Sequence, residues 1–537
     1  MSRADKADQL VDSGAYDDAL RLLAHPASAR ELAIRTRLLV FLGRHGEALH
    51  EIERGATRFP NSVELTVNRA NALSYMGRHR EALAIYLKLP ASNATTEVMM
   101  NTATSMHRLR RHKEAATIFF NLAHQPDGDA RQYSAGMAIS DYIDDVDFEM
   151  VQRFRKEYVK HFYNNTFEAP VPEDLRLDRK LTIGYISADF THHSLLSSYT
   201  PVLQYYDKAA FRTVLYISNP PNEYAMHCTL MADDAIGIQS VSAAKVCERI
   251  KADKIDILVD MSGHTLGNRM DVLSQKPAPI QIHGWGYGCG TGMPMIDWIF
   301  SDQWTIPPSA RQWLTEKVWD LPCSIAFYPL VGLPPVLPQP VVQNGFVTFG
   351  YAGRYEKVST AVEEVWARIL LMVPDSRILF KCGYFDSDSR REEVIARWAE
   401  LGVTENRLIL HGSGSRTEHL ATMSEIDIGL DPWPMGNGVT AWEMLWMGVP
   451  SVCKMGNNVG ARVCGAVQHS VGLHDWVTAN EEEYVALATT RNMGDVAKLR
   501  ASMRERLLEG KASNPKYYAE EVFKAYRAMW RIYVESR

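Results

Sequence analysis

Short apolar segments alternate with segments of helical hydrophobic spacing from residue 181 onward. The strand-like segments before about residue 330 are LTIGYIS, RTVLYIS, IDILVDMS, IQIHGW and DWIFSD. After a proline-rich stretch, LVGLPPVLPQP, the chain continues with FVTFGYAG, SRILFKCG, NRLILHG, EIDIGLDPW and PSVCKMG, separated by helical segments such as AVEEVWARILLMV. Strands and helices in alternation predict parallel sheets with helices on both faces. The pattern therefore predicts two α/β halves that place their strand carboxyl ends at a common ligand cleft.

The first 125 residues repeat one helical motif. The segments GAYDDAL, GRHGEAL, GRHREAL and RRHKEAA share a frame, and their alanines are 29, 34 and 33 residues apart. These alanines are Ala19, Ala48, Ala82 and Ala115. A period near 34 is typical of tetratricopeptide (TPR) repeats, which stack as helical hairpins into an α-solenoid. We expect its concave groove to hold a peptide or protein; alternatively, the repeats only support the rest or mediate self-association. Residues 126–176 keep a helical period and are expected to continue the stack.

The segment DPWPMGNGVTAWEMLWMGVPSV offers a site for an anion. A strand ends at Asp431, the loop Gly436-Asn437-Gly438 follows, and a helix is predicted from Thr440 to Met447. Glycines admit a ligand to the backbone, and a helix amino end attracts a group such as a diphosphate. Glu443 is placed to accept hydrogen bonds from ribose hydroxyls. An equally good interpretation is that Thr440 and Glu443 form only a capping box.

Two histidines follow strands of the first half. His193 comes a few residues after LTIGYIS, and His264 follows another strand end in VDMSGHTLGNR. Imidazoles at strand ends of one half can share a site, where they assist proton movement or bond a hydroxyl. Taken singly, each histidine is more often a structural residue bonded to backbone.

Composition excludes several classes of function. The net charge of -6 gives no basic face for nucleic acid. The seven cysteines lack CxxC spacing, which argues against a disulfide framework or a zinc site. The carboxylate groups at 386–388 and 144–147 lie in polar contexts typical of solvated surface. We therefore expect a diphosphate to be neutralised by Lys or Arg and helix N–H groups, without a metal or other cofactor. Without a long apolar run, the chain is predicted to be cytoplasmic and not to bind a membrane.

These features together resemble glycosyltransferase family 41, the O-linked N-acetylglucosamine transferases and SPINDLY-type fucosyltransferases. The resemblance runs end to end and implies TPR repeats followed by a GT-B fold of two Rossmann-like halves. It implies repeats in 1–125, connecting helices and a linker in 126–178, an N-terminal catalytic half in 179–335, and a nucleotide-sugar-binding half with the final helix in 336–537. The segments that carry it are GYISADFTHH, ILVDMSGHT, KPAPIQIHGWGYGCGTGMPMIDW, SDQWTIPP, FVTFGYAGRYEKVS, WARILLMVPDSRILFKCG and TAWEMLWMGVPSV.

The resemblance also implies site residues. Catalytic positions are His193 in the D-[FY]-x-x-H pattern, His264 in GHT, and Lys357, which matches the lysine that contacts the donor diphosphate. His192 matches no functional position. The donor-binding positions comprise a glycine near the sugar, the base-binding segment, the phosphate loop and the ribose-binding carboxylate. They are Gly286, Arg354, Gly414, Arg416, His419, Asn437, Gly438, Thr440 and Glu443.

Three departures from the family pattern lie in the donor pocket. The segment from Gly350 to Lys357 is one residue longer than the FNN or FNQ form. Ala441 stands where relatives have a second threonine, and Gly288–Gly292 replaces a PGTSG or PNTTG loop.

The resemblance implies inverting, metal-independent transfer of N-acetylglucosamine from UDP-GlcNAc to a Ser or Thr hydroxyl of a protein held in the TPR groove. The alternatives are fucose from GDP-fucose, N-linked glucose from UDP-glucose, or a TPR scaffold on an inactive GT-B body. Homo-oligomerisation is left open.

Overall fold

The computed structural model describes residues 2–164, 166–191, 193–328 and 334–537. His192 lies outside them. Two compact units make up the chain, Met1–Ile139 and Ser140–Arg537. The three boundaries drawn from the sequence between its four segments stay a prediction.

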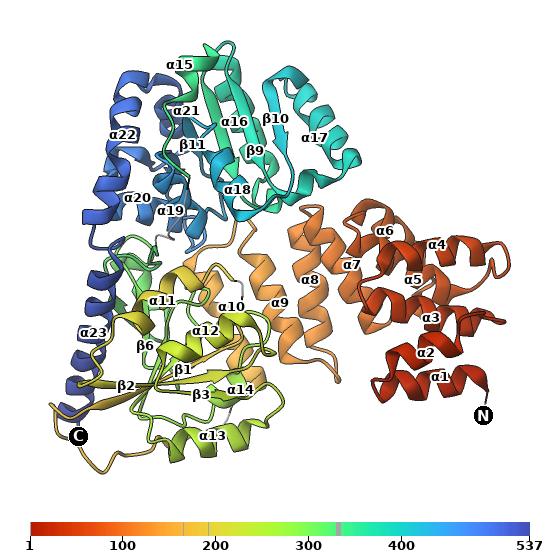
Figure 1. Ribbon diagram of the computed structural model, residues 1–537, viewed down its shortest axis with the longest axis horizontal. Coiled ribbons are helices and arrows are strands. Elements are labelled where there is room, and N and C mark those ends of the chain that lie inside the picture. Colours follow the sequence, from red (N-terminus) through yellow and green to blue (C-terminus); the bar gives the residue numbers. More distant parts are fainter. Residues whose placement is uncertain (1, 165, 192, 329–333) are drawn as a thin grey trace. The chain divides into compact units, whose positions relative to one another are not determined.

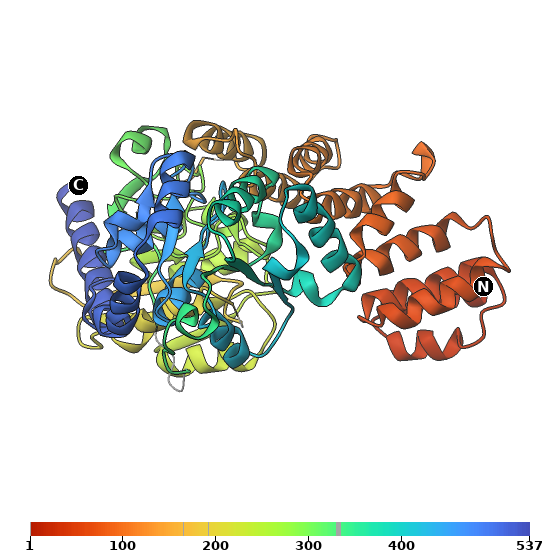
Figure 2. The same cartoon turned by 90° about the horizontal axis from the view of Figure 1, so that it is seen from above.

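The first unit is a stack of helical hairpins. Its helices are α1 (Arg3–Asp12), α2 (Tyr16–Leu22), α3 (Ala29–Phe41), α4 (His45–Ala56), α5 (Val63–Tyr75), α6 (His79–Tyr86), α7 (Thr96–Arg108), α8 (His112–Ala123) and α9 (Ala130–Ser140), with a 3-10 turn η1 (Ala91–Asn93). Consecutive helices pack as antiparallel pairs (Figures 1 and 2). The four repeat alanines are fully buried, which confirms the predicted close helix packing.

A left-handed residue ends the first helix of each hairpin. Gly14, Gly43 and Gly77 have φ of 78°, 77° and 78°, where glycine carries no steric penalty. In the fourth repeat Arg110 takes this position with φ 64°. The turn geometry therefore persists where the glycine does not.

The first half of the second unit contains one parallel sheet. Its strands are β1 (Leu181–Ser187), β2 (Phe211–Ile217), β3 (Asp234–Gly237), β4 (Ile257–Asp260), β5 (Ile280–His283), β6 (Trp298–Ser301) and β7 (Lys317–Asp320), in the order β3-β2-β1-β4-β5-β6-β7. Its helices are α10 (Phe148–Phe162), α11 (Leu196–Gln204), α12 (Glu223–Met231), α13 (Ala243–Ala252), α14 (Met270–Leu273) and η2 (Pro308–Trp313). The five strands expected from apolar segments are confirmed. The edge strands β3 and β7 are half-exposed and lack such segments.

The second half repeats this architecture. Its strands are β8 (Thr348–Ala352), β9 (Arg377–Lys381), β10 (Leu408–His411), β11 (Ile428–Leu430), β12 (Ser451–Lys454) and β13 (Val477–Thr478), in the order β10-β9-β8-β11-β12-β13. Its helices are α15 (Pro340–Asn344), α16 (Thr360–Met372), α17 (Asp388–Glu400), α18 (Arg416–Met423), α19 (Val439–Trp446), α20 (Val463–Ser470), α21 (Glu481–Thr490), α22 (Met493–Glu509) and α23 (Pro515–Glu535), with 3-10 turns η3 (Tyr355–Lys357), η4 (Gly383–Asp386), η5 (Glu405–Arg407) and η6 (His474–Trp476).

Strand order reverses between β1 and β4 in one sheet and between β8 and β11 in the other. Ligands of open α/β sheets bind at such points, beyond the carboxyl ends of the strands. His193 follows β1, His264 follows β4, and Lys357 and Asp431 follow β8 and β11. The fold therefore places the expected site residues at both switch points.

Helix α10 does not continue the stack. Gln152 donates from Nε2 to the Cys289 oxygen at 2.5 Å, and Arg155 donates from Nε to the Gly290 oxygen at 2.9 Å. The buried face of this helix, which belongs to the second unit, packs on a loop of the first half. Sequence periodicity detects such a face but does not identify its partner.

The last helix, α23, packs on α11 and β5 of the first half (Figure 1). Trp285 donates from Nε1 to the Tyr518 hydroxyl at 2.8 Å, and Trp530 donates from Nε1 to the Arg176 oxygen at 3.2 Å. Trp530 is fully buried, with the Arg179 guanidinium 4.3 Å from its ring centre. The helix thus completes the core of the first half.

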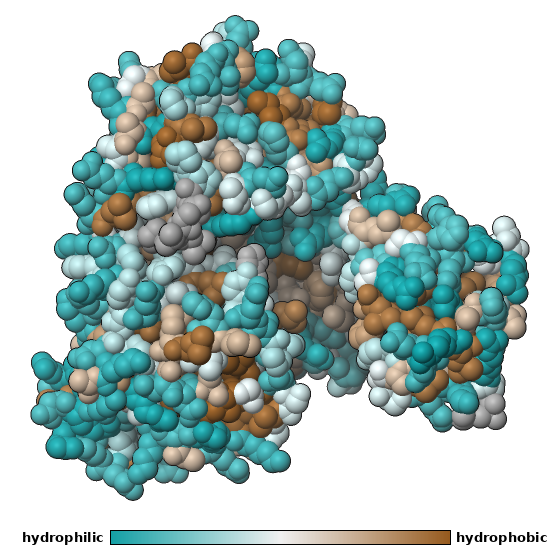
Figure 3. Space-filling view, in the orientation of Figure 1, coloured by the Kyte–Doolittle hydropathy of each residue, from teal (hydrophilic) through white to brown (hydrophobic). Residues whose placement is uncertain are grey.

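No helix among the described residues is long and apolar enough to cross a membrane. Hydrophilic residues predominate on the face of residues 140–537 drawn in Figure 3.

Replacing Trp530 by alanine is expected to destabilise the second unit. Removing a buried tryptophan forfeits its packing and leaves a cavity, at a cost of about 3–5 kcal/mol. Urea unfolding followed by circular dichroism measures the loss. The control is Ile532→Ala on the same helix, where the side chain is 41% exposed and the expected change is below about 0.5 kcal/mol. Equal effects of the two substitutions would contradict the packing described for α23.

Candidate functional site

Lys357 lies against the glycine-containing loop of the second half. It ends η3, the turn after β8, and its Nζ donates to the Gly436 oxygen at 2.6 Å. Asn437 ties the same loops together by donating from Nδ2 to the Ala352 oxygen at 3.2 Å. The longer segment from Gly350 to Lys357 therefore still brings the lysine to the loop that the sequence analysis singled out.

Helix α19 begins directly after this loop. Its cap is Gly438, two residues before the predicted start at Thr440, and this glycine has no side chain with which to bond the first amides. A Cβ on Gly438 would lie 2.9 Å from Cδ1 of Ile325, so a larger residue here would require the Ile325 side chain to move. Thr440 lies inside the helix, and Glu443 bonds elsewhere. The capping-box interpretation of these two residues is therefore wrong.

Glu443 is the centre of a charged group. Its Oε1 lies 2.5 Å from Nη1 of Arg416, and its Oε2 lies 3.5 Å from Nε2 of His419. Both partners belong to α18, while Glu443 is buried in α19. The structure thus brings together the predicted ribose-binding carboxylate and two residues of the predicted base-binding segment.

Gly414, just before α18, lies beside a lysine that the sequence analysis did not single out. A Cβ there would be 3.1 Å from Nζ of Lys381, which donates to the Gly412 oxygen at 2.7 Å. Lys381 ends β9, so its position at a strand carboxyl end was the signal available in the sequence.

Burial shifts the titration of the charges beneath the loop. It lowers the pKa of Lys357 to about 8, and the charge of Arg354 acts in the same direction. Burial raises the pKa of Asp431 well above its usual value, although the backbone N–H of Asn437, 2.8 Å from Oδ1, opposes the shift. Arg354 itself donates to the Tyr142 hydroxyl at 2.6 Å. The site therefore holds a lysine that titrates near physiological pH.

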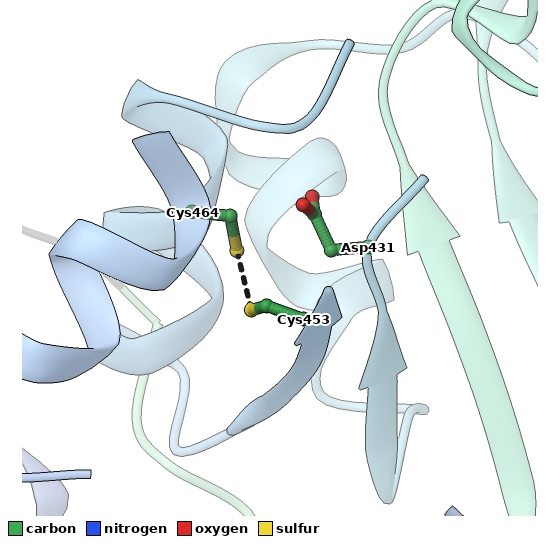
Figure 4. A group of neighbouring side chains, drawn as sticks. All are labelled: Asp431, Cys453 and Cys464. Atoms are coloured by element: carbon green, nitrogen blue, oxygen red, sulfur yellow. Dashed lines mark hydrogen bonds between the residues drawn. The ribbon is translucent and has the colours of Figure 1, made fainter. Parts of the chain in front are cut away.

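Asp431 also lies beside two buried thiols, Cys453 of β12 and Cys464 of α20 (Figure 4). Ligand atoms of the three residues lie within 4.8 Å of one another, and the two sulfurs are 3.1 Å apart. Burial raises the pKa of both thiols, which favours protonated, hydrogen-bonded sulfurs. This group can hold a metal only after the thiols lose their protons. The sequence spacing of the cysteines gave no sign of the pair.

His193 is exposed at the carboxyl end of β1. Its Nδ1 accepts the backbone N–H of Leu195 at 3.3 Å, so a neutral ring carries its proton on Nε2. Burial raises the pKa of Asp189, four residues earlier, and the charge of His193 opposes this shift.

His264 is buried in the loop after β4. Its Nε2 lies 2.9 Å from the Thr291 oxygen and its ring packs edge-on against Tyr158 at 4.7 Å. Burial lowers the pKa of His264 to about 3, with the charge of Arg155 adding to the effect. The imidazole is therefore neutral at physiological pH.

Gly286 packs tightly on the first half. A Cβ there would lie 2.9 Å from the Ser262 carbonyl carbon and 3.0 Å from Cε1 of His283. Packing alone therefore requires glycine, and the predicted approach of Gly286 to the donor sugar stays a prediction. His283 and its partner Asp260, 2.8 Å apart, are buried residues that the sequence analysis missed.

The acidic side chains of the segments 386–388 and 144–147 lie on the surface, as predicted. Asp386 accepts the backbone N–H and the hydroxyl of Ser413, both at 2.6 Å. Asp147 caps α10 through the N–H of Met150 at 2.9 Å. Both therefore have structural roles.

Known proteins share the sequence and fold of this chain. A probable UDP-N-acetylglucosamine–peptide N-acetylglucosaminyltransferase SPINDLY from Petunia hybrida is 34% identical over 72% of this chain and 41% of its own length. The protein of the same description from Arabidopsis thaliana is 33% identical over 67% of this chain and 40% of its own length. The chain thus spans about two fifths of the length of these curated relatives.

A solved structure matches nearly the whole chain. A mutant of the Thermobaculum terrenum O-GlcNAc transferase aligns with a TM-score of 0.77 and 24% identity, covering 99% of this chain and 98% of that one. This likeness confirms the fold of helical repeats followed by two parallel α/β sheets. The model of glycosyl transferase family 41 matches residues 153–327 and 341–522. Because these segments make up more than half of the chain, the protein belongs to glycosyl transferase family 41.

Proposed function

We propose that this protein is an inverting, metal-independent glycosyltransferase that moves N-acetylglucosamine from UDP-N-acetylglucosamine to a Ser or Thr hydroxyl of a protein or peptide. The observation that carries the proposal is the hydrogen bond from Lys357 Nζ to the loop at the start of α19. A buried ammonium beside a helix amino end suits a diphosphate. The descriptions of the SPINDLY relatives support the choice of donor.

The donor lies across the carboxyl ends of the second sheet. Lys357 and the first amides of α19 hold the diphosphate, with Asn437 and Gly438 shaping the loop. Glu443 accepts hydrogen bonds from ribose hydroxyls, while the segment from Gly414 through Arg416 and His419 faces the base. Arg416 forms an ion pair with the buried Glu443, which holds the carboxylate in place for the ribose.

Transfer then proceeds by direct displacement. The acceptor oxygen bonds to the anomeric carbon as the bond from that carbon to the diphosphate oxygen breaks, which inverts the configuration. Charge grows on the leaving diphosphate, where Lys357 and the α19 amides stabilise it. A donor phosphate oxygen takes the acceptor proton, and UDP leaves.

The histidines of the first half position substrates in this proposal. His193 presents Nε2–H, a donor, toward a sugar or acceptor oxygen, because its Nδ1 already accepts from Leu195. In His264 the Nε2–H bonds Thr291, and within the described residues Nδ1 has no hydrogen-bond partner. This buried acceptor is suited to a hydroxyl of the sugar. Neither ring needs to act as general base.

The acceptor is a peptide segment bound along the concave face of the TPR repeats. Repeats that stack into a solenoid present an extended surface of this kind. Reducing, intracellular conditions fit the seven cysteines, all of which are free.

Thermal-shift measurements with UDP, UDP-N-acetylglucosamine, UDP-glucose, GDP and GDP-fucose test the donor. We expect stabilisation by UDP and UDP-N-acetylglucosamine, because ligands that bind only the folded state raise its melting temperature. Mass spectrometry of a Ser/Thr peptide incubated with the donor then detects the transferred sugar. Stabilisation by GDP and GDP-fucose alone would show that the donor is GDP-fucose and not UDP-N-acetylglucosamine. Binding of none of the five would favour the scaffold alternative.

Lys357→Met is expected to lower the transfer rate by roughly 10²-fold or more, since it removes one preorganised contact to the leaving group. The matched control is Lys498→Met, an exposed lysine of the same half, which should retain wild-type turnover. Circular dichroism spectra of both variants check that the fold is intact. Wild-type turnover in folded Lys357→Met would refute the assignment.

Affinity for UDP is expected to fall as the pH rises above about 8. Lys357 attracts the diphosphate only when protonated, and its folded-state pKa of about 8 places the loss of that proton in this range. Above it, the dissociation constant should rise by roughly tenfold per pH unit. Calorimetry between about pH 7.5 and 9.5 measures the change. Lys357→Arg, which stays charged throughout, should remove the dependence, whereas pH-independent binding by the wild type would contradict the prediction.

A further inference from the structure

Both ring nitrogens of His283 face hydrogen-bond acceptors. Nδ1 lies 2.8 Å from Oδ2 of Asp260, and Nε2 lies 3.1 Å from the backbone oxygen of Tyr287. Asp260 also accepts the backbone N–H of Ser262 on Oδ1 at 3.1 Å and that of Gly263 on Oδ2 at 2.9 Å, so both of its oxygens act as acceptors. Neither a carboxylate nor a carbonyl has a proton to give. Both contacts of this fully buried ring are hydrogen bonds only when both nitrogens carry protons, as in an imidazolium.

The charges around the ring support this form. Burial alone would lower the pKa of His283, but the hydrogen bond and charge of Asp260 and the charge of Glu316 raise it above its usual value. His264 also faces the ring but is neutral, because burial lowers its pKa to about 3. The charged side chains that act on the ring, Asp260 and Glu316, thus both favour its proton.

Two loops close on the ring between its nitrogens. A Cβ on Gly263, in the loop after β4, would lie 2.8 Å from Cε1 of His283. A Cβ on Gly286, in the loop after β5, would lie 3.0 Å from the same atom. His283 is therefore the common support of both loops, and these loops carry the predicted site residues His264 and Gly286.

The loop after β5 reaches across to the second half. The Tyr287 hydroxyl lies 3.8 Å from the sulfur of Met435. Met435 precedes Gly436, whose oxygen accepts from Lys357. A continuous set of contacts thus runs from the His283 ring through Tyr287 to the loop that faces the donor diphosphate.

We propose that His283 is a positioning residue of the transfer site: as an imidazolium it fixes the loop Gly284–Gly288 of the first half against the loop at Met435 of the second. When Nε2 loses its proton, its lone pair faces the Tyr287 oxygen. The repulsion between these two atoms releases the loop. The site then loses the alignment of acceptor and donor, whereas the diphosphate contacts of Lys357 persist. The consequence for transfer rests on the proposed function, but the protonation and the loop contact do not.

Two NMR measurements test the structural part on the full-length protein. In protein labelled with ¹⁵N-histidine, the signals that disappear in His283→Gln identify His283; both nitrogens should be protonated at neutral pH, and Asp260→Asn should make the ring neutral. In protein labelled at methionine methyl groups, the Met435 signal, assigned with Met435→Leu, should shift in His283→Gln. His227→Gln, which changes an exposed histidine, should leave it unmoved.

The wild type provides the same test without a substitution. As the pH is raised, the Met435 methyl signal should move in step with the loss of the second His283 proton. A ring that is neutral at neutral pH would overturn the proposal, as would a Met435 signal that stays constant while His283 titrates.

Kinetics test the role in transfer. His283→Gln is expected to lower kcat by roughly 10- to 100-fold through misalignment, with UDP affinity within about threefold of the wild type. It should also remove the alkaline decline of kcat measured at saturating donor. Unchanged kcat in the variant would overturn the positioning role. Absence of transfer by the wild type would instead refute the proposed function, and the NMR results would then decide on His283 alone.

Discussion

One buried carboxylate organises the loop Gly436-Asn437-Gly438. Asp431 ends the strand β11, and the chain after it turns back so that the amide of Asn437 bonds its Oδ1. Gly436 comes so close to the same carboxylate that a side chain there would collide with it. The lysine that closes the loop from the other side is drawn to this charge and to the carbonyl it bonds. The carboxylate therefore positions both the start of α19 and the lysine.

The two halves are held in one unit by elements that belong to neither sheet. The segment before the first sheet bonds the loop at Cys289 and Gly290, and its backbone at Phe148 donates to the Asn457 oxygen at 2.8 Å. Arg462 of the second half donates to the Trp304 oxygen of the first at 2.7 Å. These are backbone-directed bonds, so they fix position with little dependence on the opposing side chain.

The central strands and the glycine-containing loop before α19 could be predicted from the sequence, because each depends on local pattern, whereas Lys357, Arg416 and His419 were proposed only from the resemblance to the family. An apolar run between turns defines a buried strand, and Gly436-Asn437-Gly438 before a helix defines the loop that Lys357 meets. Pairs such as His283 with Asp260, or Cys453 with Cys464, could not be predicted, since their members come from different elements that only the fold brings together. The edge strand that begins at Lys317 lacks an apolar run and could not be predicted either. The loop on which α10 packs is likewise determined only by the tertiary fold. Gly286 shows the opposite case. The resemblance to the family suggested that this glycine lies near the sugar, but packing against the first half is already sufficient to require a glycine there.

The return of α23 has a consequence for biosynthesis. A ribosome makes the first α/β half long before it makes residues 515–535, yet Tyr185, Phe211 and Trp285 of that half are covered by this helix. One apolar face of the nascent sheet therefore stays exposed to water while more than 200 further residues are synthesised. Such a face is a natural target for chaperones that bind unfinished chains. The core of the first half is therefore completed only after the second half has been synthesised.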